Sequence, residues 1–228
     1  MTHSAVLEEL DALIVSRNIL QHPFYVAWER GDLTRDQLAT YATVYYPHVA
    51  GFPSYLRAAA AQTADAVIHA ELERNLNDEL SHPKPHDELW LDFAEALGVD
   101  RHTVTTTPPH PAADTMISTF VRLAEEGVAS GLAALYAYES QQPEVSRRKM
   151  EGLRQRYGVE SSTGLAYFDV HATTDLEHRR GEREGLARCL DAGASPPAII
   201  DAAHQALDAY WGLLDGVCEQ AGIVACQT

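Results

Sequence analysis

The segment HATTDLEH places His171, Asp175 and His178 at positions i, i+4 and i+7. In one continuous α-helix these side chains would lie on one face, on successive turns. Two imidazoles and a carboxylate that converge in this way suit a first-row metal such as iron, manganese or zinc. A polar face exposed to water explains the segment alone equally well, but the neighbouring Tyr167 and Phe168 favour partial burial. Because a buried charged trio is costly without a compensating cation, the segment is a candidate metal site.

Two further segments carry candidate ligands. In NDELSHPKPHDELW, Glu79 lies seven residues before His86, about two helical turns, and His82 competes with His86 on helical geometry. In LAALYAYESQQP, Glu139 ends an uncharged apolar stretch, where a buried carboxylate is normally paired or metal-bound. Each glutamate taken alone could instead be a solvated helix end. Together the three segments offer three carboxylates and three histidines from three helices, which matches a carboxylate-bridged site for two metals inside a helical bundle.

The elements that must position these residues are helices. Helical periodicity extends almost throughout the chain, whereas the apolar–polar alternation of strands is nearly absent. We therefore predict one all-α domain, residues 1–228, of about seven to nine helices. The segment 101–114, rich in Thr and Pro, is expected to be a loop. The expected helices cover a segment after Ser4, then 23–28, a segment after Thr34, and about 64–80, 87–97, 112–127, 129–141, 143–157, 161–179, 181–191 and 196–221.

Several residues mark the ends of these helices. Thr34 and Gln37 match a capping box, so a helix is expected to begin there. A break or kink in that helix is expected near Pro47 or Pro53. The segment SHPKPH is expected to interrupt the next helical stretch, because neither of its prolines has the amide that a helix needs.

Composition and charge exclude several classes of protein. The chain has 228 residues, of which 46% are hydrophobic, enough for one well-packed core and too much for intrinsic disorder. Its formal net charge of −16 disfavours binding to nucleic acids and to anionic membrane surfaces. No apolar stretch approaches the roughly 20 residues that span a bilayer. The opening MTHSAVLEELDALIV lacks the basic region and apolar run of a signal peptide.

Cysteine usage indicates the compartment. Cys189, Cys218 and Cys226 form no CxxC pair, and an odd number without a pairing framework is typical of a reducing compartment. Neither a nucleophile elbow nor a cysteine motif supports Ser-His-Asp or Cys-His catalysis. We therefore expect a cytoplasmic protein.

Four motifs resemble those of a known family. HPFYVAW, NDELSHPKPHDELW, YAYESQQPEVSRRKM and YFDVHATTDLEH, in this order and spacing, are similar to the CADD-like proteins, named for a chlamydial protein associating with death domains. These are haem-oxygenase-like dimetal oxidases, and they share a fold with pyrroloquinoline-quinone synthase and the thiaminase-type proteins. The resemblance covers about residues 20–190 and implies a haem-oxygenase-like bundle, two metal ions (Fe/Fe or Fe/Mn), O₂ as co-substrate, an external reductant and a homodimer. It selects His86 over His82, and the metal ligands that it implies are Glu79, His86, Glu139, His171, Asp175 and His178.

The activity that this resemblance implies is oxygen-dependent synthesis of 4-aminobenzoate, a folate precursor, from the protein's own side chains. Tyr25, in HPFY, matches the tyrosine that supplies the ring, and Lys149, in SRRKM, matches the lysine that supplies the amino group. Tyr41 matches a further tyrosine thought to assist the oxidation. Arginine could not replace Lys149 as an amine donor, because it has no primary amine and stays protonated. Without the resemblance, ordinary packing would explain both tyrosines.

The sequence leaves alternatives open. A dimetal oxidase of this type could act on an external amino acid or fatty acid, in which case the protein's mass stays unchanged during turnover. A metal-free helical interaction protein would need a large exposed apolar patch. A thiaminase-type hydrolase would need a cysteine nucleophile, and the three cysteines lie in the last two expected helices, away from the segment of Glu139.

Overall fold

Helices make up all of the regular secondary structure in residues 2–226, the part of the chain that the computed structural model describes. Nine of the twelve α-helices contain eleven or more residues, in agreement with the predicted all-α bundle. The elements are α1 (His3–Ser16), η1 (Ile19–Gln21), α2 (Pro23–Arg30), α3 (Arg35–Ala61), α4 (Ala66–Ser81), α5 (His86–Ala96), α6 (Arg101–Thr106), α7 (Pro111–Glu126), α8 (Val128–Glu139), α9 (Gln142–Arg156), α10 (Ser162–His171), α11 (Asp175–Asp191), α12 (Pro196–Gln220) and η2 (Val224–Cys226).

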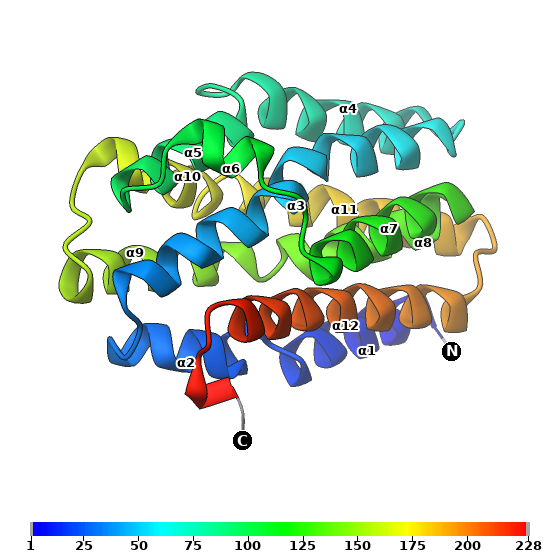
Figure 1. Cartoon of the computed structure of the whole chain (residues 1–228). Helices are drawn as coiled ribbons and strands as arrows, with labels where there is room; N and C mark the ends of the chain where they lie inside the picture. The colour runs from blue at the N-terminus through cyan, green and yellow to red at the C-terminus, as the bar shows by residue number, and fades with distance from the viewer. Residues whose placement is uncertain (1, 227–228) are drawn as a thin grey trace.

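The bundle is built around α8. Every residue from Gly131 to Glu139 is buried, as the apolar sequence GLAALYAY requires of a helix that is hydrophobic on all sides. Helices α7, α11 and α12 pack around it, and α3 packs against α4, α5 and α7. In Figure 1, α1 and α12 lie along one side of the bundle and α4 and α5 along the opposite side, with α3 crossing between them. The central helix therefore carries the Glu139 carboxylate into the core at its last turn.

Two of the predicted helix signals have different outcomes. Thr34 and Gln37 form the expected capping box, with each side chain accepting a hydrogen bond from the other residue's backbone amide. The break expected near Pro47 or Pro53 is wrong, because α3 continues through both residues. Twelve of its side chains are buried, and this packing keeps the segment helical although each proline removes a backbone hydrogen bond.

Two segment boundaries also differ from the prediction. The helix expected over 161–179 is in fact α10, which ends at His171, and α11, which begins at Asp175. A turn separates them, in which the Thr173 hydroxyl donates a hydrogen bond to the carbonyl oxygen of Val170 (3.1 Å). The loop expected over 101–114 contains the short helix α6, which Asp100 caps by accepting a hydrogen bond from the Thr103 amide.

The cysteines correct a further expectation. Cys218, near the end of α12, is joined by a disulfide to Cys226 in η2, so the absence of a pairing that we inferred from the spacing is wrong. The chain turns back after α12, which brings two cysteines eight residues apart together without a CxxC motif. Cys189 is free and buried. No helix in the described part of the chain is long and apolar enough to cross a membrane.

Candidate metal centre

The six ligand candidates come together as two groups of three inside the bundle. Within each group, one ligand atom from each residue lies within 4.8 Å of the others. All six side chains are buried, with no residue more than 6% exposed. The first group consists of Glu79, His86 and His171, and the second consists of Glu139, Asp175 and His178. Residues of both groups line one small internal cavity.

Helix ends supply most of these ligands. His86 is the first residue of α5, Asp175 is the first of α11, and Glu139 and His171 are the last of α8 and α10. The six ligands therefore come from five helices, and the expectation of three helices is wrong. The regular i, i+4, i+7 face that we inferred for HATTDLEH is also wrong, because a turn separates His171 from Asp175.

In the first group, two histidines converge on one carboxylate. Nδ1 of His86 lies 2.9 Å, and Nε2 of His171 lies 3.8 Å, from Oε1 of Glu79. The other nitrogen of each ring donates to a backbone carbonyl oxygen: His86 Nε2 to His82 (3.1 Å) and His171 Nδ1 to Tyr167 (2.6 Å). When the rings are neutral, these donations place the protons on the outer nitrogens and leave the inward nitrogens with the lone pairs that a metal ligand requires. The imidazole of His82 is exposed, and its backbone carbonyl alone contributes here.

The second group has the same organisation. Nδ1 of His178 lies 3.4 Å from Oε1 of Glu139 and 3.6 Å from Oδ1 of Asp175. Its Nε2 faces Oδ2 of Asp78 at 3.1 Å, so a carboxylate accepts the outer N–H. The amide Nδ2 of Asn75 donates to both carboxylate oxygens of Glu139, each at 3.1 Å. The orientation of Glu139 is therefore set by α4 as well as by its own helix.

Three residues around the second group were not found from the sequence. Asn75 lies on α4 one turn before Glu79, Asp78 immediately precedes Glu79, and Glu182 lies one turn after His178 on α11. Glu182 is 1% exposed, and neither of its carboxylate oxygens has a hydrogen-bond partner. The spacing of Asn75 and Glu182, four residues from a predicted ligand, is a signal that could have identified both.

The site has an excess of negative charge that its histidines partly offset. Burial alone lowers the pKa of His171, but Asp175 and Glu79 outweigh it and raise the pKa to about 9. Burial likewise opposes charge on His178, while Asp175 and Glu139 raise its pKa to about 11. Burial raises the pKa of Asp175 and of Glu182, because a charged carboxylate there is poorly solvated. The region thus stabilises positive charge.

The donor set fits two metal ions. Both oxygens of Asp175 and the inward nitrogens of His86 and His178 are buried without a hydrogen-bond partner. Buried polar atoms are rarely left unpaired, and each of these atoms points into a group of potential ligands. Imidazole and carboxylate donors of this kind suit iron and manganese. The residues that the structure brings together are therefore those that a two-metal site needs.

A second buried cluster surrounds Lys149. Its Nζ, on α9, donates a hydrogen bond to the Tyr41 hydroxyl on α3 (2.7 Å) and lies 5.0 Å from the ring centroid of Tyr25 on α2. All three side chains are 2% exposed or less. Burial lowers the pKa of Lys149 well below its usual value, which favours the neutral amine. A neutral primary amine is a nucleophile, and that of Lys149 lies beside the phenol ring of Tyr25, with which it could react.

Aromatic rings connect this cluster to the first group of ligands. The ring centroids of Tyr41 and Trp90 lie 5.5 Å apart, and those of Trp90 and Tyr167 lie 4.8 Å apart. Tyr167 in turn lies 4.1 Å from the ring of His171. The lysine cluster and the ligand groups are therefore parts of one continuous buried region.

Comparison with known proteins identifies relatives over nearly the whole chain. A family model described as an iron-containing redox enzyme matches residues 39–211. The 4-aminobenzoate synthase of Nitrosomonas europaea is 36% identical, and the alignment covers 96% of this chain and 93% of that protein. A domain with a heme oxygenase-like fold from Shewanella denitrificans has a TM-score of 0.80 at 16% identity, covering 98% and 94% of the two chains. A CADD-like protein of unknown function from Nostoc punctiforme has a TM-score of 0.77 at 18% identity, covering 96% and 98%.

Proposed function

The chain belongs to the haem-oxygenase-like family of iron-containing redox enzymes, and we propose that it is a 4-aminobenzoate synthase that consumes its own Tyr25 and Lys149. In 4-aminobenzoate the amino group and the carboxylate are para to each other. The hydroxyl carbon and the Cβ-bearing carbon of a tyrosine ring are also para. The bond between Cβ and Cα of Tyr25 thus breaks, and oxidation by O₂ converts Cβ into the carboxylate carbon. Nitrogen from Lys149 replaces the hydroxyl oxygen, which leaves as water, and the bond between this nitrogen and Cε of Lys149 breaks.

The observation that carries this proposal is the position of Lys149. Its Nζ lies 5.0 Å from the ring centroid of Tyr25, and both side chains are buried. The hydrogen bond to Tyr41 orients the amine, and burial favours its uncharged form. Arginine, with no primary amine and a charge at every accessible pH, could not serve in its place.

Two metal ions, iron with iron or iron with manganese, would be held by the two groups of ligands. The chemistry that such ions supply is the activation of O₂ with electrons from an external reductant. The protein's own contribution is to hold the ligands through Asn75, Asp78 and two backbone carbonyls, and to exclude water from the region. Exclusion of water keeps the Lys149 amine unprotonated and protects the oxidised ring.

The size of the cavity also supports a substrate built into the chain. The cavity beside the ligand groups has a volume of only about 10 Å³. Pockets for small organic ligands usually enclose about 300–1,000 Å³. A fatty acid would therefore need a rearrangement of the surrounding helices, whereas the ring of Tyr25 is already inside the core.

Reconstitution tests the proposal. The purified protein is loaded anaerobically with iron, with or without manganese, then supplied with O₂ and ascorbate and assayed for 4-aminobenzoate and for intact mass. We expect product from the wild type, together with loss of the Tyr25 side chain. Tyr25→Phe and Lys149→Arg are expected to yield none.

Matched variants control for indirect effects. Lys84→Arg changes the chain's other lysine, which is half-buried and paired with Asp92, and Tyr136→Phe changes a tyrosine that bonds to Asp11 near the surface. Both are expected to keep the wild-type yield. Product from Lys149→Arg at the wild-type level, or an unchanged mass after product formation, would show that the substrate is external.

We also propose that the protein is a cytoplasmic homodimer. The reaction needs an external reductant and delivers a folate precursor, and both requirements are met in the cytoplasm. Light scattering of the purified protein tests the dimer, and cell fractionation tests the location. A monomer at micromolar concentration, or recovery outside the cytoplasm, would contradict the respective statement.

A further inference from the structure

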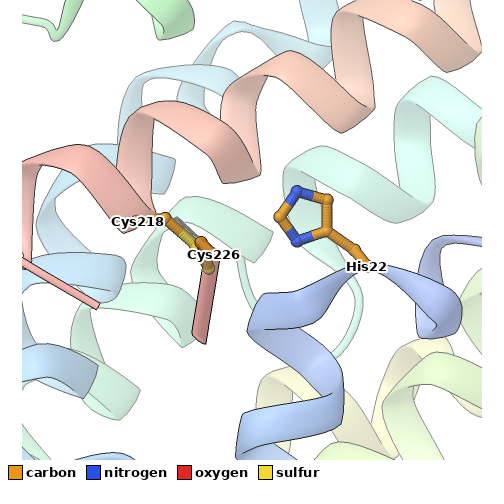
Figure 2. A group of neighbouring side chains, drawn as sticks. All are labelled: His22, Cys218 and Cys226. Atoms are coloured by element: carbon orange, nitrogen blue, oxygen red, sulfur yellow. A yellow bond between two sulfur atoms is a disulfide. The ribbon is translucent and has the colours of Figure 1, made fainter. Parts of the chain in front are cut away.

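The disulfide lies where the C-terminal turn meets the start of α2. It joins Cys218, which is buried in α12, to the half-buried Cys226 in η2, and it closes a loop of eight residues. Figure 2 shows the imidazole of His22 on the side facing this disulfide, on the segment that leads into α2. One ligand atom of His22 and the two sulfur atoms lie within 4.8 Å of one another.

A His-Cys-Cys group of this kind could be either a metal site or a redox pair. Nδ1 of His22 accepts a hydrogen bond from the Phe24 amide (3.1 Å), so the ring proton is on Nε2, which donates to Asp215 (3.1 Å). Burial lowers the pKa of His22, which keeps the ring neutral in this arrangement. Both nitrogens are thus engaged and both sulfurs are bonded to each other, which favours the redox pair.

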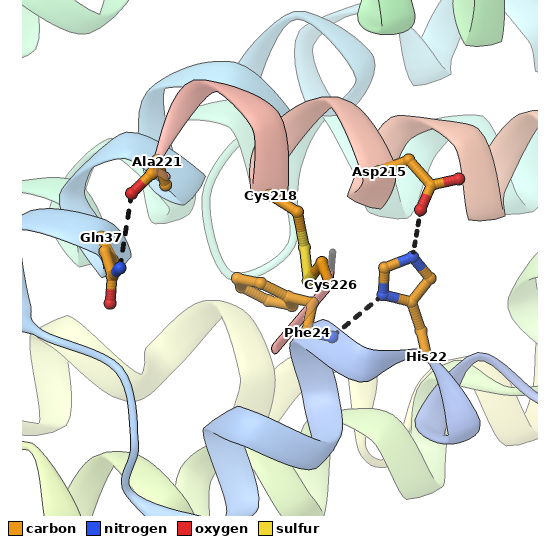
Figure 3. Close-up of a disulfide and its surroundings, with 7 residues drawn as sticks. All are labelled: His22, Phe24, Gln37, Asp215, Cys218, Ala221 and Cys226. Carbon is orange, nitrogen blue, oxygen red and sulfur yellow. Dashed lines mark hydrogen bonds and ion pairs between the residues drawn. A yellow bond between two sulfur atoms is a disulfide. The ribbon is translucent and has the colours of Figure 1, made fainter. Parts of the chain in front are cut away.

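The turn that the disulfide holds packs on α2. Helix η2 contacts both α2 and α12, and Figure 3 shows the Phe24 ring beside the two sulfur atoms. Phe24 is fully buried, and its ring centroid lies 5.2 Å from that of Tyr25 and 4.9 Å from that of Tyr41. Helix α2, whose Phe24 ring packs on Tyr25, is therefore in contact with a segment that the disulfide holds to α12.

We propose that Cys218 and Cys226 form a thiol–disulfide exchange site for a dithiol reductant, and that reduction loosens the first turn of α2. A thiolate of the dithiol attacks Sγ of Cys226, the more accessible sulfur, and Sγ of Cys218 leaves as a thiolate that takes a proton from water. The second thiol of the reductant then attacks the mixed disulfide and releases Cys226. The reductant becomes a disulfide, and the protein gains two thiols. This exchange needs neither metal nor O₂, and only its effect on product rests on the proposed function.

Loosening follows from the geometry of the closed loop. Without the bond, the segment after α12 regains the conformational freedom that an eight-residue crosslink removes, which corresponds to roughly a ten- to hundredfold change in a local opening equilibrium. The hydrogen bonds of His22 to Phe24 and Asp215 remain, so the start of α2 stays attached to α12. The segment after α12, which includes η2, detaches from α2 more often. We therefore expect a local change rather than unfolding.

Alkylation and hydrogen exchange test the site in the full-length, folded protein. Oxidised protein is treated with dithiothreitol and alkylated without denaturant, and peptides are identified by mass. We expect Cys218 and Cys226 to become alkylated, and amide exchange in residues 23–30 to accelerate at least roughly tenfold and to recover on reoxidation. The double variant Cys218→Ser, Cys226→Ser should show the fast exchange under all conditions. Cys189→Ser, at the free buried cysteine, should respond like the wild type.

Several outcomes overturn the proposal. Unchanged exchange in residues 23–30 after reduction would do so, as would a disulfide that resists dithiothreitol in the folded protein. Stoichiometric zinc binding by reduced protein, abolished in the double cysteine variant, would replace the exchange site by a metal site. With ascorbate as electron donor, oxidised protein should yield more 4-aminobenzoate than prereduced protein. Absence of product from both forms would contradict the proposed function and leave the exchange result intact.

Discussion

Replacement of Asn75 by leucine tests whether α4 orients a metal ligand. The Asn75 amide donates two hydrogen bonds to Glu139, and hydrogen bonds to charged groups contribute about 1.5–3 kcal/mol each. At 3.1 Å both belong at the weak end, which gives about 3 kcal/mol for the pair. Asn75→Leu also removes the buried Oδ1, which has no hydrogen-bond partner. Removal of this unpaired polar atom offsets about 1–3 kcal/mol of the loss. The net loss is about 0–2 kcal/mol, and a loss of about 1.4 kcal/mol within this range corresponds to tenfold weaker metal binding.

Competition of the protein with a chelator for Mn²⁺ under anaerobic conditions measures this loss. Asn77→Leu is the matched control, because Asn77 is exposed on the same helix two residues away. We expect wild-type affinity for the control and roughly tenfold weaker binding for Asn75→Leu, with circular dichroism unchanged in both. Equal affinities for the two variants would refute the argument that Asn75 holds Glu139 in a binding geometry.

Three further predictions concern packing, charge and the lysine. Gly152→Ala should lower the free energy of unfolding, measured in urea, by about 1–3 kcal/mol, because the added Cβ would lie 2.6 Å from Nε1 of Trp28. Gly212→Ala, whose Cβ would meet no atom within 4 Å, should not lower it. The metal-free protein should lose stability as the pH rises from 6.5 through about 9. The reason is that the pKa of His171 is higher in the folded than in the unfolded protein, so its stabilising charge is lost over that range. A free energy of unfolding that stays constant over this range would contradict the raised pKa of His171. Lys149→Met should abolish product without lowering the melting temperature, since a buried amine is replaced by an apolar chain of similar length.

Helix existence was predictable from local signals, but several boundaries were not. Helix α2 begins at Pro23, where the sequence indicated, and Thr34 and Gln37 form the predicted capping box of α3. Continuity of α3 through Pro47 and Pro53 depends on packing against other helices, which local rules do not contain. The end of α10 at His171 was missed because periodicity alone does not reveal a three-residue turn.

The ligand types were predictable, and spacing could have identified Asn75 and Glu182, whereas the arrangement of the ligands was not predictable. Residue chemistry and the family resemblance identified six side chains that the structure brings together. The role of the His82 carbonyl and of Asp78 could not be inferred, because each depends on the direction of an imidazole nitrogen in three dimensions. The disulfide was missed for a related reason, since only the reversal of the chain after α12 brings Cys218 and Cys226 together.

The burial of Lys149 is the feature that stability alone explains least well. The chain has two lysines, and this one lies in the core with a tyrosine hydroxyl as its hydrogen-bond partner and four aromatic rings within 5.4 Å of its Nζ. Desolvation makes a lysine here costly to charge, and leucine or methionine would fill the same space without that cost. The same desolvation keeps the amine neutral, which is the state that a nitrogen donor to the Tyr25 ring requires. The position is therefore unfavourable for folding and favourable for chemistry, as expected of a side chain retained for reaction rather than for packing.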